Sequence, residues 1–330
     1  MRRLLVVWFA GCLALGGSFV GLGQAGVAGC RLFSNEEDTI FEISVDELTG
    51  QITAYPVFHD HFDWFILGLT AGPDGLLYFS DTFRHRILRI DPDGAFWEVV
   101  VEQEALYPAE LSFGADGTLY FSNMICSGVC VGGACPVDFA GIWAIEDATA
   151  ESPGPARCLI DPLCFDIFPV EADSCRSPEL RYVPSGPYAG GLLTDAINPH
   201  PSLCVVTNPT PLKVAPFLRD EDLSRFSRLR SEGGYPTYIT AFEEAFLPNG
   251  DLLATDPYGD EVLRFAPDGS HVGRFASFNR PFRLAVDSAG NVYVTSNDDM
   301  LRVFDENGGL IVLLHVGRKL ESIAVLETAP

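Results

Sequence analysis

The sequence is poor in basic residues: 21 Lys and Arg stand against 45 Asp and Glu, for a formal net charge of −24. A surface this acidic repels phosphate backbones and anionic lipids, so we expect no nucleic acid partner and no membrane contact beyond an N-terminal anchor. Several motifs are also absent, namely the G-x-S-x-G nucleophile turn, the H-E-x-x-H zinc motif and the phosphate-binding glycine loop. The enzyme classes that these motifs mark are therefore not indicated.

Charge is missing altogether from residues 4–23, which follow Arg2 and Arg3 and precede the small-residue run QAGVAG. This pattern predicts an export signal within residues 1–29, with an uncleaved N-terminal anchor as the alternative. We therefore expect an exported protein, periplasmic or extracellular. A third interpretation uses VAGC at 27–30, which resembles a bacterial lipobox and would place a lipid on Cys30.

The cysteines bear on that choice. Of nine, Cys12 lies in the export signal, and the remaining eight form an even set that could make four disulfides in an oxidising compartment. Lipidation of Cys30 would leave an odd number, and the spacing in CSGVCVGGAC is not that of a zinc knuckle. We therefore expect disulfides. The candidates are Cys30, Cys126, Cys130, Cys135, Cys158, Cys164, Cys175 and Cys204.

A repeat organises the rest of the chain. Residues 69–100, 246–276 and 285–315 each read as an apolar strand, a Gly turn, a second apolar strand ending in Ser or Thr, a third strand, a second Gly turn and a fourth strand. Turns such as P-D-G and P-N-G place Gly where a hairpin needs a positive φ. A four-stranded unit of about 40 residues is typical of one propeller blade.

The two ends of the chain complete the ring. Residues 25–44 align with 71–90, so the mature chain opens on a second strand, and residues 320–327 supply the missing first strand. Joining them removes free sheet edges, and it puts Cys30 at the start of a strand, which disfavours lipidation. We predict an all-β, six-bladed β-propeller over residues 30–330, with a fourth blade at about 186–230. Disulfide-rich insertions are expected near 124–138 and 158–187.

The pattern PDGxLYxSD…xRIxRxDPDG resembles that of the NHL-repeat and regucalcin/gluconolactonase-like six-bladed propellers. The resemblance covers nearly the whole mature chain. It implies the fold and not the activity, because this fold hosts lactonases, lyases, receptors and passive binding modules.

Six predicted second strands end in Ser or Thr followed by Asp or Asn. A feature present in every blade indicates scaffold, with Asn and Asp side chains accepting backbone N–H groups of the following turn. The pairs are Ser34–Asn35, Ser80–Asp81, Ser122–Asn123, Thr207–Asn208, Thr255–Asp256 and Ser296–Asn297.

The resemblance also implies a metal site. Regucalcin-like enzymes hold a divalent cation with one Glu near the start of an innermost strand and with Asn and Asp at strand ends. The matching positions are Glu110 or Glu243 with Asn123, Asn208 and Asp256, whose oxygens suit Ca²⁺ or another divalent cation. The family's Glu usually stands in an E-G-P context, which does not occur here.

The stretch FHDHFDWF (58–65) joins the first predicted blade to the second at the mouth of the central channel. His59 and His61 could bind one metal or act as acid and base; the alternatives are a ligand contact without chemistry and a structural connection. Other residues expected at the channel mouth are Asp63, Asp81, Arg84, Arg283 and Asn297.

Taken together, these patterns predict a binding module that holds a small molecule, glycan or protein at the channel mouth. The alternative is a divalent-cation-dependent lactonase or hydrolase of the regucalcin kind. A lyase that uses His59 and His61 is the third hypothesis.

Overall fold

The computed structural model describes residues 30–36, 38–45, 52–59, 66–103, 106–123, 125–126, 141–160, 175–176, 180–194, 204–207, 213–216, 243–257 and 259–327. The predicted export signal lies outside these residues, as do His61, Asp63, Asn208, Cys130, Cys135 and Cys164. In the described part, no helix has the length and apolar character needed to cross a membrane.

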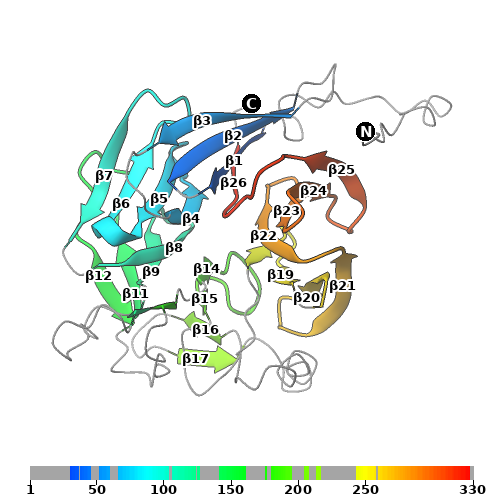
Figure 1. Ribbon diagram of the computed structural model, residues 1–330. Coiled ribbons are helices and arrows are strands. Elements are labelled where there is room, and N and C mark those ends of the chain that lie inside the picture. Colours follow the sequence, from blue (N-terminus) through cyan, green and yellow to red (C-terminus); the bar gives the residue numbers. More distant parts are fainter. Residues whose placement is uncertain are drawn as a thin grey trace.

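The described strands pair into six four-stranded antiparallel sheets around a common centre (Figure 1). One sheet contains β4 (Ile66–Ala71), β5 (Leu77–Asp81), β6 (Arg86–Ile90) and β7 (Trp97–Glu102), with the short helix η1 (Thr82–Arg84) between β5 and β6. The next contains β8 (Pro108–Phe113), β9 (Leu119–Asn123), β11 (Gly141–Ile145) and β12 (Arg157–Ile160).

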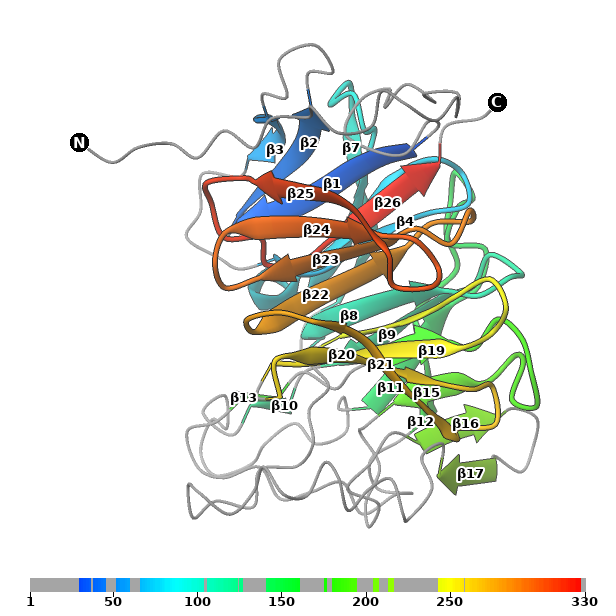
Figure 2. The same cartoon turned by 90° about the vertical axis from the view of Figure 1, so that its right-hand side faces the viewer.

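In these two sheets the strands run in chain order from the centre of the ring outwards, and two further sheets have the same arrangement. They are β18 (Glu244–Phe246), β19 (Leu252–Asp256), β20 (Glu261–Phe265) and β21 (His271–Ser277), followed by β22 (Pro281–Val286), β23 (Val292–Ser296), β24 (Met300–Phe304) and β25 (Leu310–His315). Figure 2 shows β22 to β25 side by side, seen along the edge of the ring.

The ring closes where the sequence predicts. The C-terminal β26 (Ala324–Glu327) pairs antiparallel with β1 (Cys30–Glu36), with Cys30 opposite Glu327 and Phe33 opposite Ala324. The sheet continues outwards through β2 (Thr39–Val45) and β3 (Ile52–His59). The predicted closure of the ring by one strand from each end of the chain is therefore confirmed. It joins the two ends of the described chain within one sheet.

Five of the six sheets are full blades, with middle strands of five residues or more. The remaining sheet has only strands of three or four residues: β14 (Leu180–Tyr182), β15 (Leu192–Thr194), β16 (Cys204–Thr207) and β17 (Lys213–Pro216). The propeller fold is confirmed, whereas the predicted six blades correspond to five full blades and this short-stranded sheet.

The fourth predicted blade also starts at the wrong strand. Its innermost strand is β14, which falls inside the range 158–187 that was predicted to be an insertion, and β12 overlaps the other end of that range. Three residues of mixed polarity are too short to show a strand period. The two predicted insertions meet, however, since β10 (Ile125–Cys126) pairs with β13 (Cys175–Arg176).

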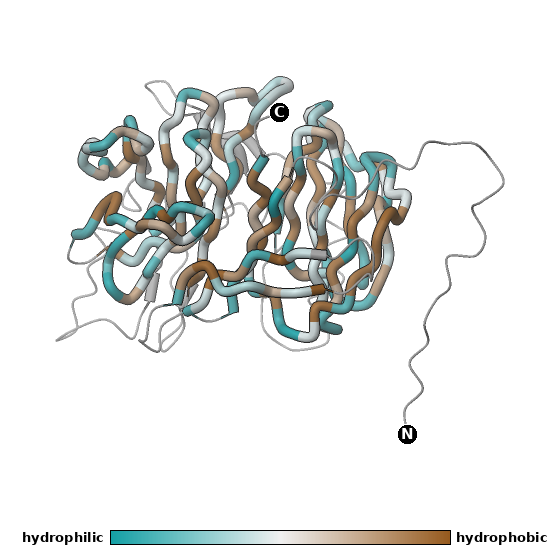
Figure 3. Tube along the Cα trace, turned by 90° about the horizontal axis from the view of Figure 1, so that it is seen from above, coloured by the Kyte–Doolittle hydropathy of each residue, from teal (hydrophilic) through white to brown (hydrophobic). Residues whose placement is uncertain are grey.

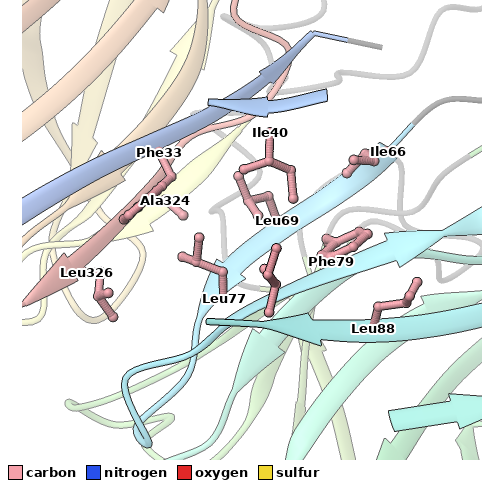
Figure 4. Close-up of a cluster of buried hydrophobic side chains, with 10 residues drawn as sticks. Phe33, Ile40, Ile66, Leu69, Leu77, Phe79, Leu88, Ala324 and Leu326 are labelled. Atoms are coloured by element: carbon pink, nitrogen blue, oxygen red, sulfur yellow. The ribbon is translucent and has the colours of Figure 1, made fainter. Parts of the chain in front are cut away.

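The core lies between neighbouring sheets. Phe33 and Ala324 from the closing sheet pack against Leu69, Leu77 and Phe79 of the next (Figure 4). Each fully buried side chain of this size contributes roughly 1.5–3 kcal/mol, so the faces shared between sheets supply most of the stability. Figure 3 shows hydrophobic residues along the strands and hydrophilic ones gathered at the turns.

The glycine turns have the conformation that the sequence predicts. Gly75 and Gly117 have φ of 83° and 82°, and a Cβ at either position would meet nothing within 4 Å. Backbone conformation, and not crowding, therefore requires Gly there.

Candidate functional site

Three innermost strands, β4, β8 and β22, begin with a break in their ladder. The register shifts between Ile66 and Leu69, between Pro108 and Leu111, and between Pro281 and Leu284. A bulge of this kind leaves a backbone N–H without its ladder partner and redirects a side chain. The site is built from the residues at these breaks.

A hydroxyl from the second strand accepts the N–H at each break. The same bond occurs beside β18, and in all four cases donor and acceptor are 12 residues apart. The bonds are Gly68 N to Ser80 Oγ at 2.8 Å, and Glu110 N to Ser122 Oγ, Glu243 N to Thr255 Oγ1 and Arg283 N to Thr295 Oγ1, each at 3.1 Å. The repeated Ser/Thr therefore supports the innermost strand.

Two details of the predicted Ser/Thr–Asp/Asn pairs need correction. In the β22–β25 sheet the hydroxyl belongs to Thr295, so the equivalent pair is Thr295–Ser296 and not Ser296–Asn297. The Asp or Asn of each pair does not always bind the following turn. Asp256 Oδ1 does so, accepting a hydrogen bond from Gly259 N at 2.9 Å, whereas Asn123 Oδ1 accepts one from Tyr107 N, which lies before β8.

Four charged side chains from four different sheets meet at the centre: Glu110 of β8, Arg181 of β14, Glu243 beside β18 and Arg283 of β22. We call them the charge quartet. Arg181 lies 3.3 Å from Glu110 and forms an ion pair with Glu243. Arg283 Nη1 lies 2.8 Å from Glu243 Oε2 and 3.6 Å from Glu110 Oε1. Each guanidinium therefore contacts both carboxylates, and the formal charges cancel.

The quartet is mostly shielded from solvent. Side-chain exposure is 8–9% for the two glutamates and 15% for the two arginines. Backbone oxygens hold Arg181 in place, since its Nε donates to Glu244 O at 2.8 Å and its Nη1 to Leu180 O at 2.7 Å. Arg283 lies over the ring of Phe282, 5.0 Å from the ring centre. The quartet is therefore a fixed arrangement of hydrogen-bond donors and acceptors, the kind of group that orients polar ligands in binding sites.

The equivalent position on β4 has no side chain. A Cβ on Gly68 would lie 2.1 Å from the backbone oxygen of Ala109, so Gly is required for β4 to approach β8. The charged set therefore stops at β8 and does not continue onto β4.

The predicted metal ligands are only partly assembled. The structure brings Glu110 and Glu243 together, but both carboxylates face guanidinium groups, and Asn123 and Asp256 bind backbone N–H groups instead. Among the described residues, no group of three or more His, Cys, Asp and Glu is placed to hold a metal ion. A cation at the quartet would have to compete with two arginines.

His59 lies at the outer rim. It is the last residue of β3, the outermost strand of its sheet, three strand spacings or about 14 Å from β26. Its Nδ1 is 2.8 Å from Thr39 Oγ1 and 3.5 Å from Asp38 Oδ1. The start of the FHDHFDWF stretch is therefore held by its neighbours on the same sheet, at a distance from the quartet.

Among the described residues, Asp81, Arg84 and Asn297 of the predicted channel mouth are held locally or exposed. Both Nε and Nη2 of Arg86 bind Asp81 Oδ2, at 2.8 and 2.7 Å, and Arg84 adds a contact at 3.5 Å. Asn297 lies exposed in the turn after β23. Of the channel-mouth candidates that the structure describes, Arg283 alone belongs to the quartet.

Sequence reasoning missed Arg181. The triplet Leu180–Arg181–Tyr182 places a charge between apolar residues, as Phe282–Arg283–Leu284 does, and this likeness was the available signal.

One cysteine leaves the set of disulfide candidates. Cys30 is a free thiol, its sulfur 3.9 Å from Asp287 Oδ2. Burial, followed by the charges of Asp287 and Glu327, raises the pKa of Cys30 to about 11. Cys30 is therefore outside any bridge in the described residues, and the pairing of the other candidates stays a prediction.

No protein-family model matches the sequence, and no curated protein sequence matches it significantly. Solved structures do match in fold. One chain of a nidogen–laminin complex aligns with a TM-score of 0.60 at 13% identity, covering 90% of this chain and 98% of that one. A protein of unknown function from Bacteroides caccae gives 0.53 at 12% identity, covering 91% and 99%.

A gluconolactonase from Xanthomonas campestris aligns with a TM-score of 0.51 at 14% identity, covering 83% of this chain and 88% of that one. The predicted resemblance to NHL-type and gluconolactonase-like propellers is thus confirmed at the level of the fold. Identities this low carry the fold alone, so the function has to be argued from the site.

Proposed function

We propose that the chain is an exported β-propeller, of six blades when the short β14–β17 sheet is counted, that binds a small molecule, glycan or protein at its channel mouth. The charge quartet carries this proposal. It sets two guanidinium groups and two carboxylates at the meeting point of four innermost strands. Such a site offers directed donors and acceptors to a polar ligand at no net charge.

The alternative is a lactonase or hydrolase that depends on a divalent cation. The convergence of Glu110 and Glu243 favours it, because two carboxylates near the channel could share Ca²⁺. The cation would polarise a carbonyl oxygen. The pairing of both glutamates with Arg181 and Arg283 supports the binding hypothesis over this one.

The two hypotheses differ in their response to calcium. We would measure Ca²⁺ binding by calorimetry for the wild type, Glu243→Gln and the control Glu146→Gln, whose carboxylate lies in an exposed pair with Arg157. The same three proteins would be applied to arrays of glycans and peptides with and without chelator, after circular dichroism has shown that each is folded.

The binding hypothesis predicts no stoichiometric Ca²⁺ and an array ligand whose binding is insensitive to chelator and weakened in Glu243→Gln alone. Stoichiometric Ca²⁺ that is lost in Glu243→Gln, together with calcium-dependent lactone hydrolysis, would establish the alternative instead.

A further inference from the structure

An apolar group lies beside the charge quartet, where β4 and β8 begin. Ala109, the residue before Glu110, is fully buried, and Leu67, Phe83 and Tyr107 pack against it. These three side chains are only partly buried. We call Leu67, Phe83 and Tyr107 the apolar shelf.

The shelf and the quartet are parts of one site. On β4, the residue after Leu67 is Gly68, where an added Cβ would lie 2.1 Å from Ala109 O. The same position is 3.2 Å from Glu110 Cα, so β4 and β8 touch at this point near the centre of the ring (Figure 1). Phe83 belongs to η1, which follows β5, the strand that pairs with β4.

The shelf is also held in place by hydrogen bonds around it. Thr82 Oγ1, in η1, donates to Pro108 O at 2.6 Å, and His85 Nδ1 lies 2.6 Å from Leu106 O. The His85 ring meets the Tyr107 ring edge to face, with the ring centres 4.7 Å apart. The shelf is therefore formed before any ligand arrives, which lowers the entropy cost of binding.

The Tyr107 hydroxyl adds a hydrogen-bond donor to the shelf. Within the described part of the chain, Tyr107 is held through its backbone N, which donates to Asn123 Oδ1, and through its ring, which contacts His85. Its hydroxyl takes no part in these contacts. Burial raises the pKa of Tyr107 above its ordinary value, so the hydroxyl keeps its proton at neutral pH and can donate to a ligand.

We propose that the channel mouth takes a small molecule in which a flat apolar ring is joined to a polar head without net charge. The ring lies on the apolar shelf, and the head exchanges hydrogen bonds with the quartet and the Tyr107 hydroxyl. This inference rests on the proposed function and names the class of ligand.

Three properties of the site favour this class of ligand. An apolar shelf removes water from sugar hydroxyls without returning their hydrogen bonds, which disfavours a glycan that has no apolar ring. The shelf offers one side chain from each of three segments, whereas a stable protein interface buries about 800 Å² on each partner. The quartet has two charges of each sign, so it favours neither an anion nor a cation.

The test compares pairs of compounds that share a polar head and differ in the group attached to it. The pairs are phenyl and methyl β-D-glucoside, phenyl and methyl β-D-galactoside, and benzamide and acetamide. Dissociation constants come from saturation-transfer NMR titrations. We expect the phenyl member of at least one pair to bind about tenfold or more tightly than its methyl partner, because its ring leaves water. The strongest saturation transfer should reach the ring protons.

Two variants remove different parts of the shelf. Tyr107→Ala and Leu67→Asn, on different strands, should each weaken binding of that phenyl compound about fivefold or more and leave its methyl partner unaffected. Tyr55→Ala is the matched control, since Tyr55 lies on the outermost strand β3 and is 55% exposed. Circular dichroism shows that each variant is folded.

The inference is overturned if phenyl and methyl partners bind equally, if both shelf variants leave phenyl binding unchanged, or if no phenyl compound binds. Glu243→Gln distinguishes this failure from that of the proposed function. A glycan or peptide that binds through Glu243, with no phenyl compound binding, would keep the site and reject the ligand class. If Glu243→Gln weakens the binding of no compound, the proposed function fails, and the inference fails with it.

Discussion

Arg283 binds carboxylates from two different sheets: its Nη1 lies 2.8 Å from Glu243 Oε2 and 3.6 Å from Glu110 Oε1. Arg181 contacts the same two carboxylates from β14, in the short-stranded sheet on the other side of β18. The quartet therefore ties together four innermost strands, including the one that belongs to the least regular sheet. The quartet should therefore help to hold the ring together, which unfolding experiments can measure.

Removal of one quartet charge should be costly. Arg283→Met leaves two shielded carboxylates with one guanidinium, and we expect the free energy of unfolding to fall by about 2–4 kcal/mol, somewhat less than for a fully buried pair. Arg157→Met is the control, because its pair with Glu146 has side chains 62% and 68% exposed. That change should stay within about 0.5 kcal/mol. Equal losses in urea unfolding would show that the quartet is no more than a surface network.

The hydroxyls at the strand breaks should also be measurable. Thr255→Val and Thr295→Val keep the side-chain shape but remove the acceptor for Glu243 N and Arg283 N, in residues only 1% exposed. A buried N–H without its partner costs about 1–3 kcal/mol, and we expect each variant to lose that much. Ser288→Ala, at an exposed turn, should be near neutral in the same thermal and urea unfolding experiments. Losses as small as that of Ser288→Ala would mean that water replaces the hydroxyl.

The propeller could be predicted from sequence because its signals are periodic. Gly75 and Gly117 recur at the blade period with the positive φ that their turns require, and strands at the two chain ends complete one sheet. Glu110, Glu243 and Arg283 could also be placed near the starts of innermost strands, since a short apolar run and a Gly turn follow each of them in the sequence.

The arrangement of the site could not be predicted, for two physical reasons. Arg181 lies on a three-residue strand, too short to carry a period, so the cation that pairs with both glutamates was hidden. In the sequence, a Glu expected beside the channel suggests a metal ligand. Only the structure shows that a guanidinium from another sheet contacts this carboxylate, and that contact changes the interpretation. His59 illustrates the same limit, because sequence gives the face of the ring but not the distance from its centre.

Cys30 should react slowly. Its pKa is raised to about 11 from an ordinary 9.0, by burial first and then by Asp287 and Glu327. At pH 8 the thiolate fraction should be about a hundredfold below that of an ordinary thiol, and the alkylation rate should follow it. The rate should rise about tenfold per pH unit up to about pH 11. Because the unfolded thiol ionises first, stability should also fall between about pH 9 and 11.

Mass spectrometry of the Cys30 peptide after timed iodoacetamide treatment measures this rate. Glu327→Gln removes one of the two charges and should speed the reaction, while urea-unfolded protein gives the ordinary rate. A folded thiol that reacts as fast as the unfolded one, or a Cys30 peptide that carries lipid, would contradict the placement.

Cys126 and Cys175 should form a disulfide. They lie directly opposite each other in the β10–β13 pair, where opposed Cα atoms are about 4.5–5.5 Å apart, within the span of a disulfide. The bridge would join two cysteine-rich segments that are about 50 residues apart in the sequence. Peptide mapping of unreduced protein, exported into an oxidising compartment, should recover the linked peptides, with Cys30 as the free-thiol control. Recovery of Cys126 or Cys175 as a free thiol, or linked to another cysteine, would show that the β10–β13 register does not persist in solution.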